Sequence, residues 1–335
     1  MTMAKDRLDF IDRMKGIAIL LVIVGHILQF NKIDGGTNNK LFGIIYSFHM
    51  PLFFILSGYV ATFGRDRITG LSSFFKSIWR KAYTLLLPLF AWSLIARKYF
   101  FASDFQIIGV SDIFNTILNP DLWFLKVLFE IHVLFAIFCL LNYYLSRKGN
   151  IYIDLLTFFV ILLLPIAGYF WIDTIFFQSL LLYILFFFFG SFLSRYQFLE
   201  NFLLNNYVYA LSLFVFLVFS AHWKFAGNLF DDVLKVVLSI AAFTVLLGIT
   251  QKSNLPEWAD AQMQQMGRES LSIYVMQFYL TNRISFFSWS TGLNQYILFV
   301  LVLTLSVLIA YICIFVHKIF EKSAILNLLF YGKRL

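Results

Sequence analysis

The chain has 335 residues, of which 61% are hydrophobic and only 13% are charged. In a soluble domain, roughly a quarter of the residues are charged. No water-soluble fold of this length can hide so much apolar surface, so lipid must be the solvent for most of the chain. The net charge of +8 therefore reports membrane topology first and does not predict nucleic-acid binding.

Long apolar stretches follow one another along the chain. A hydrocarbon core of about 30 Å is crossed by about 20 residues of α-helix. On this scale we expect an all-α fold, a polytopic membrane bundle of about ten transmembrane helices in a single domain over 1–335. The predicted spans are 15–33, 43–63, 82–101, 121–142, 151–169, 177–194, 206–222, 231–250, 268–287 and 295–317. The first apolar run imitates a signal peptide, but no small-residue cleavage site follows it, so we expect it to remain as a helix.

The orientation follows from the positions of the basic residues. With the N-terminus inside and ten alternating spans, most of the 26 Lys and Arg residues fall in cytoplasmic segments. Excess Lys and Arg mark cytoplasmic loops. We therefore expect both termini on the cytoplasmic side.

The first span carries polar residues in a pattern. Lys15 and His26 are eleven residues apart, close to three helical turns, so they share a face and lie about 16 Å apart along the axis. Asp12 precedes Lys15 by three residues and falls on the same stripe. Gly16 and Gly25 flank this stripe and would permit close approach by a neighbour or a ligand. A buried, hydrogen-bonded His26 and a snorkelling Lys15 explain the pattern structurally; a catalytic site explains it functionally.

The segment "YSFHMPLFFILSGY" at 46–59 places His49 at the outer end of the second span, just before Pro51, which can open the helical ladder. Ser57 lies eight residues further on, close to the same face, and Tyr59 follows it. A histidine at a loop–helix junction is also an ordinary interfacial residue.

In the fourth span, "LWFLKVLFEIH", Trp123, Lys126 and Glu130 line one face. The two charges could neutralise each other as a structural pair, and Trp123 could belong to an aromatic belt. The alternative is that the three residues form a wall of an acceptor pocket. His132 lies off this stripe and fits a packing role.

The inner loop "RDRITGLSSFFKSIWRKAY" carries five cations, among them Lys76, Arg80 and Lys81. They report topology and contact with anionic lipid, and they also suit a docking surface for a phosphorylated cytosolic donor. No glycine-rich phosphate loop is present. Cys139 and Cys313 lie in apolar stretches without metal-ligand spacing, so we expect neither a disulfide framework nor a metal.

Taken together, "FIDRMKGIAILLVIVGH", "FHMPLFFILSGY", "LWFL", "YILFFFFGSFL" and "MGRESLSIYVMQ" resemble the acyltransferase-3 family of integral membrane O-acyltransferases. The branch looks like the fucose-4-O-acetylase-like and enterobacterial-common-antigen O-acetyltransferase-like proteins. The resemblance runs in order from residue 9 to about residue 280.

This resemblance implies a bundle of ten helices that moves an acyl group, usually acetyl from acetyl-CoA, to a hydroxyl of a glycan or lipid-linked sugar in the cell inner membrane. The family's basic-x10-His pair falls on Lys15 and His26, the preceding acid on Asp12, and the second histidine on His49. Its loop cations fall on Lys76 and Arg80. The family's late motif often ends in "IY-x-x-H", and Gln277 stands in the place of that histidine.

On this basis we expect His26, Asp12 and His49 to form the catalytic set. We expect Lys15, Lys76, Arg80 and Lys81 to bind the donor, and Trp123, Lys126, Glu130, Ser57 and Tyr59 to bind the acceptor. His26 could act as a general base or carry the acyl group covalently, and the sequence does not choose between these roles.

A small-solute transporter is the rival from another class, because many spans with intramembrane charges and a proline-broken helix suit it too. A catalytically inactive member of the same family is a third reading. The acceptor, the choice of acetyl or succinyl donor, and the oligomeric state stay open at this point.

Overall fold

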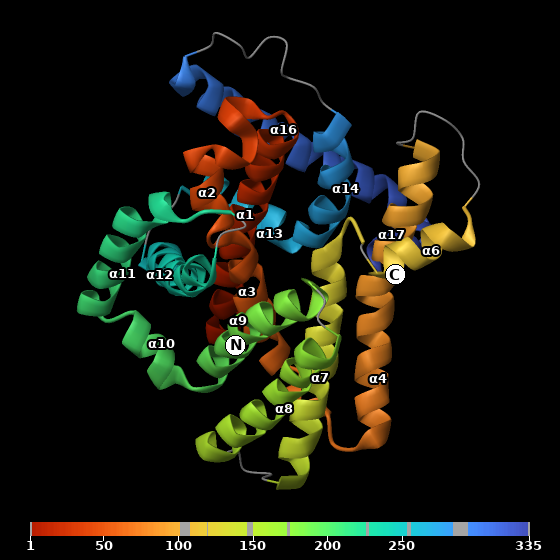
Figure 1. The fold of residues 1–335 in the computed structure, drawn as a ribbon, viewed down its shortest axis with the longest axis vertical. Helices are drawn as coiled ribbons and strands as arrows, with labels where there is room; N and C mark the ends of the chain where they lie inside the picture. Colours follow the sequence, from red (N-terminus) through yellow and green to blue (C-terminus); the bar gives the residue numbers. More distant parts are fainter. Residues whose placement is uncertain are drawn as a thin grey trace. The chain divides into compact units, whose positions relative to one another are not determined.

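The computed structural model describes residues 2–100, 108–118, 120–145, 150–172, 175–225, 228–252, 256–283 and 294–333. Within these ranges the chain forms helices and no strand, so the predicted all-α class is confirmed (Figure 1). The helices group into two compact units, Met1–Phe53 with Gln197–Phe320 and Phe54–Tyr196 with Glu321–Leu335. The prediction of a single domain over 1–335 stays a prediction.

The first unit is built around the N-terminal helix. Its elements are α1 (Thr2–Phe30), η1 (Ile33–Asn38), α2 (Lys40–Tyr46), the start of α3 (His49–Thr62), α10 (Gln197–Leu203), α11 (Asn206–Phe219), η5 (Ser220–His222), α12 (Leu229–Lys252), α13 (Glu257–Arg268), α14 (Ser270–Arg283) and α16 (Gln295–Phe320).

Helix α1 contacts α12, α13, α14 and α16, and α13 lies along it (Figure 1). Glycines permit this close approach. A Cβ atom at Gly16 would lie 2.1 Å from the carbonyl oxygen of Met263, and one at Gly267 would lie 1.8 Å from that of Asp12. No larger residue fits at either place without moving a backbone, so the small residues on both helices determine how α13 packs against the polar end of α1.

The second unit contains the remainder of α3, followed by η2 (Arg65–Arg67), α4 (Leu71–Lys81), η3 (Ala82–Leu86), α5 (Leu87–Phe90), η4 (Ala91–Phe100), α6 (Val110–Leu118), α7 (Trp123–Leu145), α8 (Ile151–Ile172), α9 (Ile175–Arg195) and α17 (Ala324–Tyr331). The segments η3 and η4 are π-helical and lie on either side of α5, which contains Pro88.

The core of the second unit is aromatic. Helix α7 packs against α8 and α9 (Figure 1). Its rings Phe135 and Phe138 contact Phe187 and Phe188 of α9 at centroid distances between 5.0 and 5.8 Å. These phenylalanines are less than 6% exposed. Edge-to-face aromatic pairs therefore hold together helices that lipid alone would not drive together.

Five segments of the described chain are long and apolar enough to cross a membrane: Lys40–Thr62, Trp123–Leu145, Ile151–Gly168, Leu229–Gln251 and Tyr296–Phe320. A sixth is counted if the bent pair Ser179–Arg195 and Gln197–Leu203 forms one span. These segments match the predicted spans 43–63, 121–142, 151–169, 231–250, 295–317 and 177–194.

Ten spans and the cytoplasmic position of both termini stay predictions. The predicted span 15–33 lies on α1, which ends at Phe30, whereas 82–101 lies largely on the π-helical stretch. The predicted 206–222 is a shorter apolar helix, and α14 covers 14 residues of the predicted 268–287. The last residue of the predicted span 82–101 and residues 284–287 of the predicted span 268–287 lie outside the described residues. Arg147 and Lys148, two of the basic residues that predict the orientation, also lie outside them.

Exposed apolar side chains support a membrane environment. On α8 and α16, large apolar side chains face outward in runs at helical spacing. They are more than 36% exposed: Leu155, Leu156, Phe159, Val160, Leu163, Leu164, Tyr296, Ile297, Phe299, Val300, Leu301, Leu303, Leu308, Ile312, Phe315 and Ile319. Contiguous apolar surface of this extent is rare on soluble monomers. The apolar helices therefore indicate a multi-pass membrane protein.

Candidate functional site

The polar stripe of α1 is present as predicted. Asp12, Lys15 and His26 all lie within the single helix Thr2–Phe30, and each is half-buried. Because the helix runs without a break between them, Lys15 and His26 share a face about 16 Å apart. The structure therefore places a cation, an acid and an imidazole along one line.

His26 is held by three side chains. Its Nδ1 atom lies 3.0 Å from Oε1 of Gln277 on α14. The ring of Phe30 stacks on the imidazole at a centroid distance of 5.3 Å, and that of Phe278 meets it edge-on at 5.5 Å. The imidazole is thus fixed both in position and in rotation about its own axis.

Helix α14 is anchored close to its start. Glu269 precedes its first turn and receives a hydrogen bond from the Ser272 hydroxyl at 3.1 Å. The same carboxylate lies 3.0 Å from Nδ1 of the buried His317 on α16. Since α14 also contacts α1 directly, these contacts hold the helix that presents Gln277 to His26.

His49 lies in the same unit as His26, at the first residue of α3. Gly25, next to His26 in the chain, leaves room for the ring of Tyr46, because a Cβ atom at this position would lie 2.6 Å from that ring. Tyr46 donates its hydroxyl to Oε1 of Gln29 at 3.0 Å, and its ring lies 4.5 Å from the imidazole of His49. The close approach that Gly16 and Gly25 predict is therefore confirmed, and protein groups occupy both places.

The helix is interrupted between α2, which ends at Tyr46, and α3, which begins at His49. The imidazole of His49 bonds back across this interruption. Its Nδ1 atom lies 2.8 Å from the carbonyl oxygen of Ile45. A carbonyl can only accept, so Nδ1 carries the hydrogen and Nε2 carries the lone pair. Lys235 of α12 belongs to the same unit and lies over the ring of Trp223, with its Nζ atom 5.4 Å from the centroid. Pro51 falls in the first turn of α3, where its missing N–H costs nothing.

The end of the stripe that carries Asp12 and Lys15 is a charged cluster. Arg13 forms an ion pair with Asp260 of α13 and donates to the carbonyl oxygen of Thr250 at 2.8 Å. Arg268 lies 3.9 Å from the carboxylate of Asp12. Burial raises the pKa of Asp12, and the charges of Lys15 and Arg268 lower it again in part. Asp12 therefore lies among cations at this end of the stripe.

The predicted donor-binding cations of the inner loop lie on α4 in the second unit. Lys76 and Arg80 are exposed and four residues apart on one face, and Lys81 is half-buried. Exposed cations at this spacing can contact phosphate oxygens.

The predicted acceptor residues also belong to the second unit. The Trp123 ring lies 5.3 Å from that of Tyr183, which stacks on Phe54 at 4.5 Å. Lys126 and Glu130 interact electrostatically, and Oε2 of Glu130 is buried without a hydrogen-bond partner in the described part of the chain.

Ser57 is half-buried, whereas Tyr59 is only 1% exposed and packs edge-on against Phe63. This burial is typical of a core residue, and the acceptor role of Tyr59 stays a prediction. His132 is buried against Phe187 with its Nδ1 on the Leu128 carbonyl oxygen, which fits the packing role expected for it.

The structure thus brings Asp12, Lys15, His26 and His49 into one unit and the remaining candidates into the other. Sequence reasoning did not find Tyr46 beside His49, or Gln29 as the partner of Tyr46. Gln29 carried a usable signal, since it follows His26 by three residues on the same face.

The whole-chain comparison identifies the class of protein. The acyltransferase-3 family model, described as an acyltransferase domain, matches residues 8–316. The chain belongs to the acyltransferase-3 family. The family's description as an acyltransferase domain, together with the apolar helices, supports a membrane acyltransferase, and the transporter reading is not favoured.

Two curated relatives share part of this sequence. The nodulation protein NolL of Sinorhizobium fredii is 34% identical over 154 residues, which cover 43% of this chain and 41% of the relative. The protein of the same name from Mesorhizobium japonicum is 33% identical over 138 residues, covering 39% and 36%. The match thus spans less than half of either relative. No solved structure matches this chain.

Proposed function

We propose that this member of the family is an O-acyltransferase that moves a short acyl group, acetyl in the first instance, from cytosolic acyl-CoA to a hydroxyl of an envelope glycan or lipid-linked sugar. The proposal rests on the imidazole of His26, which lies on an apolar helix in line with Lys15 and bonds through Nδ1 to Gln277. We place the enzyme in the cell inner membrane, and its chemistry needs no metal.

The reaction follows from the two nitrogens of His26. If Nδ1 carries the hydrogen, Nε2 is the basic atom. Nε2 takes the proton of the acceptor hydroxyl while the hydroxyl oxygen attacks the thioester carbonyl. The C–S bond then breaks, the acyl group stays on the oxygen as an ester, and the CoA thiolate leaves and recovers the proton from the imidazolium. Alternatively Nε2 attacks the thioester carbonyl first, and the C–S bond breaks as CoA leaves as the thiolate. The acyl-imidazole then passes the acyl group to the acceptor oxygen, whose proton goes to the thiolate.

Charge and depth support the donor's route. CoA carries several phosphates, and Lys15, Lys76, Arg80 and Lys81 are cations that suit them. Lys15 is three turns from His26, about 16 Å, a distance that an extended pantetheine arm can bridge. We propose that Lys15 binds the donor's phosphates at the inner mouth; the α4 cations stay predicted donor-binding residues.

We propose that His49 helps to bind the sugar by accepting a hydrogen bond from a hydroxyl other than the one whose proton His26 takes. His49 presents Nε2 as an acceptor, because its Nδ1 is engaged by Ile45. Trp123, Lys126, Glu130, Ser57 and Tyr59 remain candidates for contacts with the sugar. Aromatic faces and carboxylates are side chains that commonly line ligand sites.

Purified protein incubated with radiolabelled acetyl-CoA and an envelope glycolipid extract tests the proposal. We expect release of CoA thiol together with label in the glycolipid fraction. A transporter would neither bind nor consume acetyl-CoA, and label that stays entirely on acetyl-CoA would contradict the proposed reaction.

Lys15→Ala is expected to raise the KM for acetyl-CoA by about tenfold, because it removes one charge-assisted contact to the donor worth roughly 1.5 kcal/mol. The effect on kcat should be smaller. Steady-state kinetics with varied acetyl-CoA measures both values. Lys318→Ala, which removes an exposed lysine near the end of α16, serves as the control, and a KM for Lys15→Ala equal to that of the control would rule out the donor role.

A further inference from the structure

We propose that Gln277 is a positioning residue that selects the reactive tautomer of His26. Its side-chain carbonyl accepts the Nδ1 hydrogen of His26 and so leaves Nε2 as the nitrogen with the lone pair. The inference rests on the proposed function, in which Nε2 of His26 is the reacting atom.

The orientation of the Gln277 amide carries the first step. Its Nε2 donates to the carbonyl oxygen of Tyr274 at 3.4 Å, while its Oε1 faces Nδ1 of His26 at 3.0 Å. If the amide were flipped, its oxygen would face the carbonyl oxygen of Tyr274, and two acceptors would oppose each other. The network is satisfied only with the carbonyl oxygen toward His26, so Nδ1 must be the donor.

Burial carries the second step. Gln277 is 0% exposed, so water cannot replace the contact it makes. A buried amide oxygen without a partner costs free energy. The Nδ1–H tautomer of His26 supplies that partner and the Nε2–H tautomer does not.

The ring geometry carries the third step. Phe30 stacks on one face of the imidazole and Phe278 meets it edge-on. A half-turn of the ring about its Cβ–Cγ bond would put Cδ2 in the place of Nδ1 and so break the hydrogen bond to Gln277. Nδ1 is therefore bound to Gln277, and Nε2 remains as the reacting nitrogen.

The fourth step concerns what glutamine supplies at this place. A neutral amide can accept the Nδ1 hydrogen but cannot take the proton away, so it orients the base without adding a second one. The departure from the family's usual histidine at this position therefore leaves a hydrogen-bond acceptor in contact with His26.

Two variants of matched size separate this role from packing. Gln277→Met keeps the length and removes the acceptor, whereas Gln277→Glu keeps the acceptor in the same place. We expect kcat for acyl transfer to fall about tenfold or more in Gln277→Met and to recover at least in part in Gln277→Glu, with the KM for acetyl-CoA unchanged in both. Gln251→Met, at an exposed site, is the control.

Nitrogen-15 NMR of protein labelled at histidine gives a readout that does not depend on activity. Assigned by its absence in His26→Ala, the His26 signal should report the Nδ1–H tautomer in the wild type and the Nε2–H tautomer or a mixture in Gln277→Met. A wild-type ring in the Nε2–H form, or folded Gln277→Met with wild-type kcat and tautomer, would overturn the inference. A wild type that shows the Nδ1–H form but transfers no acyl group would instead refute the proposed function.

Discussion

His26→Ala is expected to lower kcat for acyl transfer by roughly 10²–10⁴-fold, because it removes the group that takes the acceptor's proton or carries the acyl group. Its effect on donor binding should be small, since Lys15 is three turns away on the same helix. The measurement is transfer of label from acetyl-CoA by purified protein, with single-turnover kinetics to separate binding from chemistry.

The variant should remain folded. Alanine is the best helix former, and the half-buried position lies inside α1. The loss of the bond to Gln277 leaves a buried carbonyl oxygen unpaired, which costs about 1–3 kcal/mol. Helix content and elution from a sizing column should therefore match the wild type.

His222→Ala is the matched control. His222 is exposed, lies in the same unit, and bonds through Nδ1 to the carbonyl oxygen of Val218 in the manner of a structural histidine. The control should keep full activity. Comparable activity in His26→Ala and His222→Ala would remove His26 from the reaction.

Local patterns predicted the parts of the site that lie on one helix. Asp12, Lys15 and His26 share a stripe because α1 repeats every 3.6 residues, and this could be read without a partner helix. The spans at 121–142, 151–169 and 295–317 could also be predicted locally, because an apolar run of this length is typical of a helix that crosses a membrane.

Contacts between distant segments could not be read in this way. Gln277 is 251 residues from His26 in the chain, and only the packing of α14 on α1 brings them together. The break between α2 and α3 was signalled by Pro51, yet nothing local places Tyr46 against Gly25. Such contacts form only when distant segments pack together, so the residues next to each partner in the sequence do not predict them.

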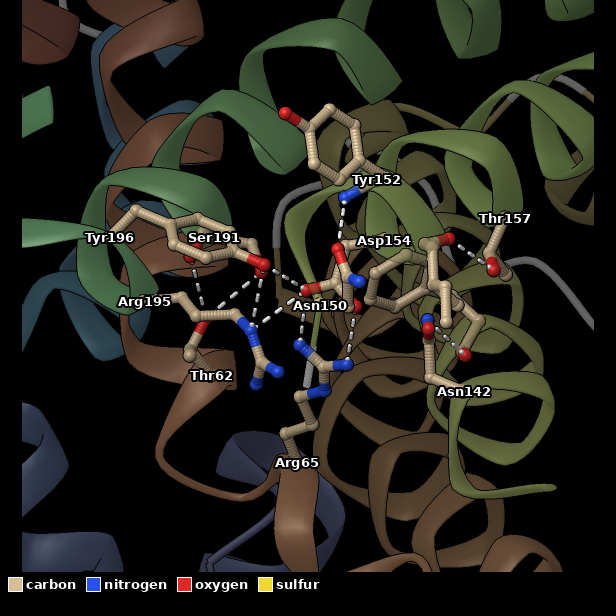
Figure 2. A network of polar contacts seen from close by, with 12 residues as sticks. Thr62, Arg65, Asn142, Asn150, Tyr152, Asp154, Thr157, Ser191, Arg195 and Tyr196 are labelled. Atoms are coloured by element: carbon tan, nitrogen blue, oxygen red, sulfur yellow. Dashed lines mark hydrogen bonds and ion pairs between the residues drawn. The ribbon is translucent and has the colours of Figure 1, made fainter. Parts of the chain in front are cut away.

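The network around Asp154 shows the same limit in the second unit. Arg65, in the loop after α3, and Arg195, at the end of α9, both pair with Asp154, which lies in the first turn of α8 and is fully buried (Figure 2). Arg65 binds both carboxylate oxygens at 2.8 Å, and the Tyr196 hydroxyl donates to one of them, also at 2.8 Å. Loop cations of the kind that mark membrane topology can thus also join helices.

The pair with Asp154 compensates the buried positive charge of Arg65. Burial alone lowers the pKa of Arg65, but the hydrogen bonds and charge of Asp154 outweigh it and raise the pKa above its usual value. Arg65 also lies over the ring of Phe138, with its guanidinium carbon 5.2 Å from the centroid. The bidentate pair joins the loop after α3 to α8, and Arg195 with Tyr196 adds the end of α9.

Asp154→Ala is therefore expected to destabilise the protein by about 3–5 kcal/mol, because it leaves the Arg65 guanidinium buried without its counter-charge. Unfolding in detergent, followed by helix content against temperature or denaturant, measures the loss. Asp66→Ala, at an exposed carboxylate beside Arg65 in the chain, should change the stability by less than about 0.5 kcal/mol.

The double variant Asp154→Ala/Arg65→Met distinguishes a lost ion pair from a lost side chain. If the cost comes from an uncompensated charge, replacing that charge by an apolar side chain of similar length should recover part of the stability, even though it removes a second polar group. A double variant that is less stable than Asp154→Ala by the full cost of Arg65→Met alone would show that the two residues act independently, and that Asp154 does not hold α8 through Arg65.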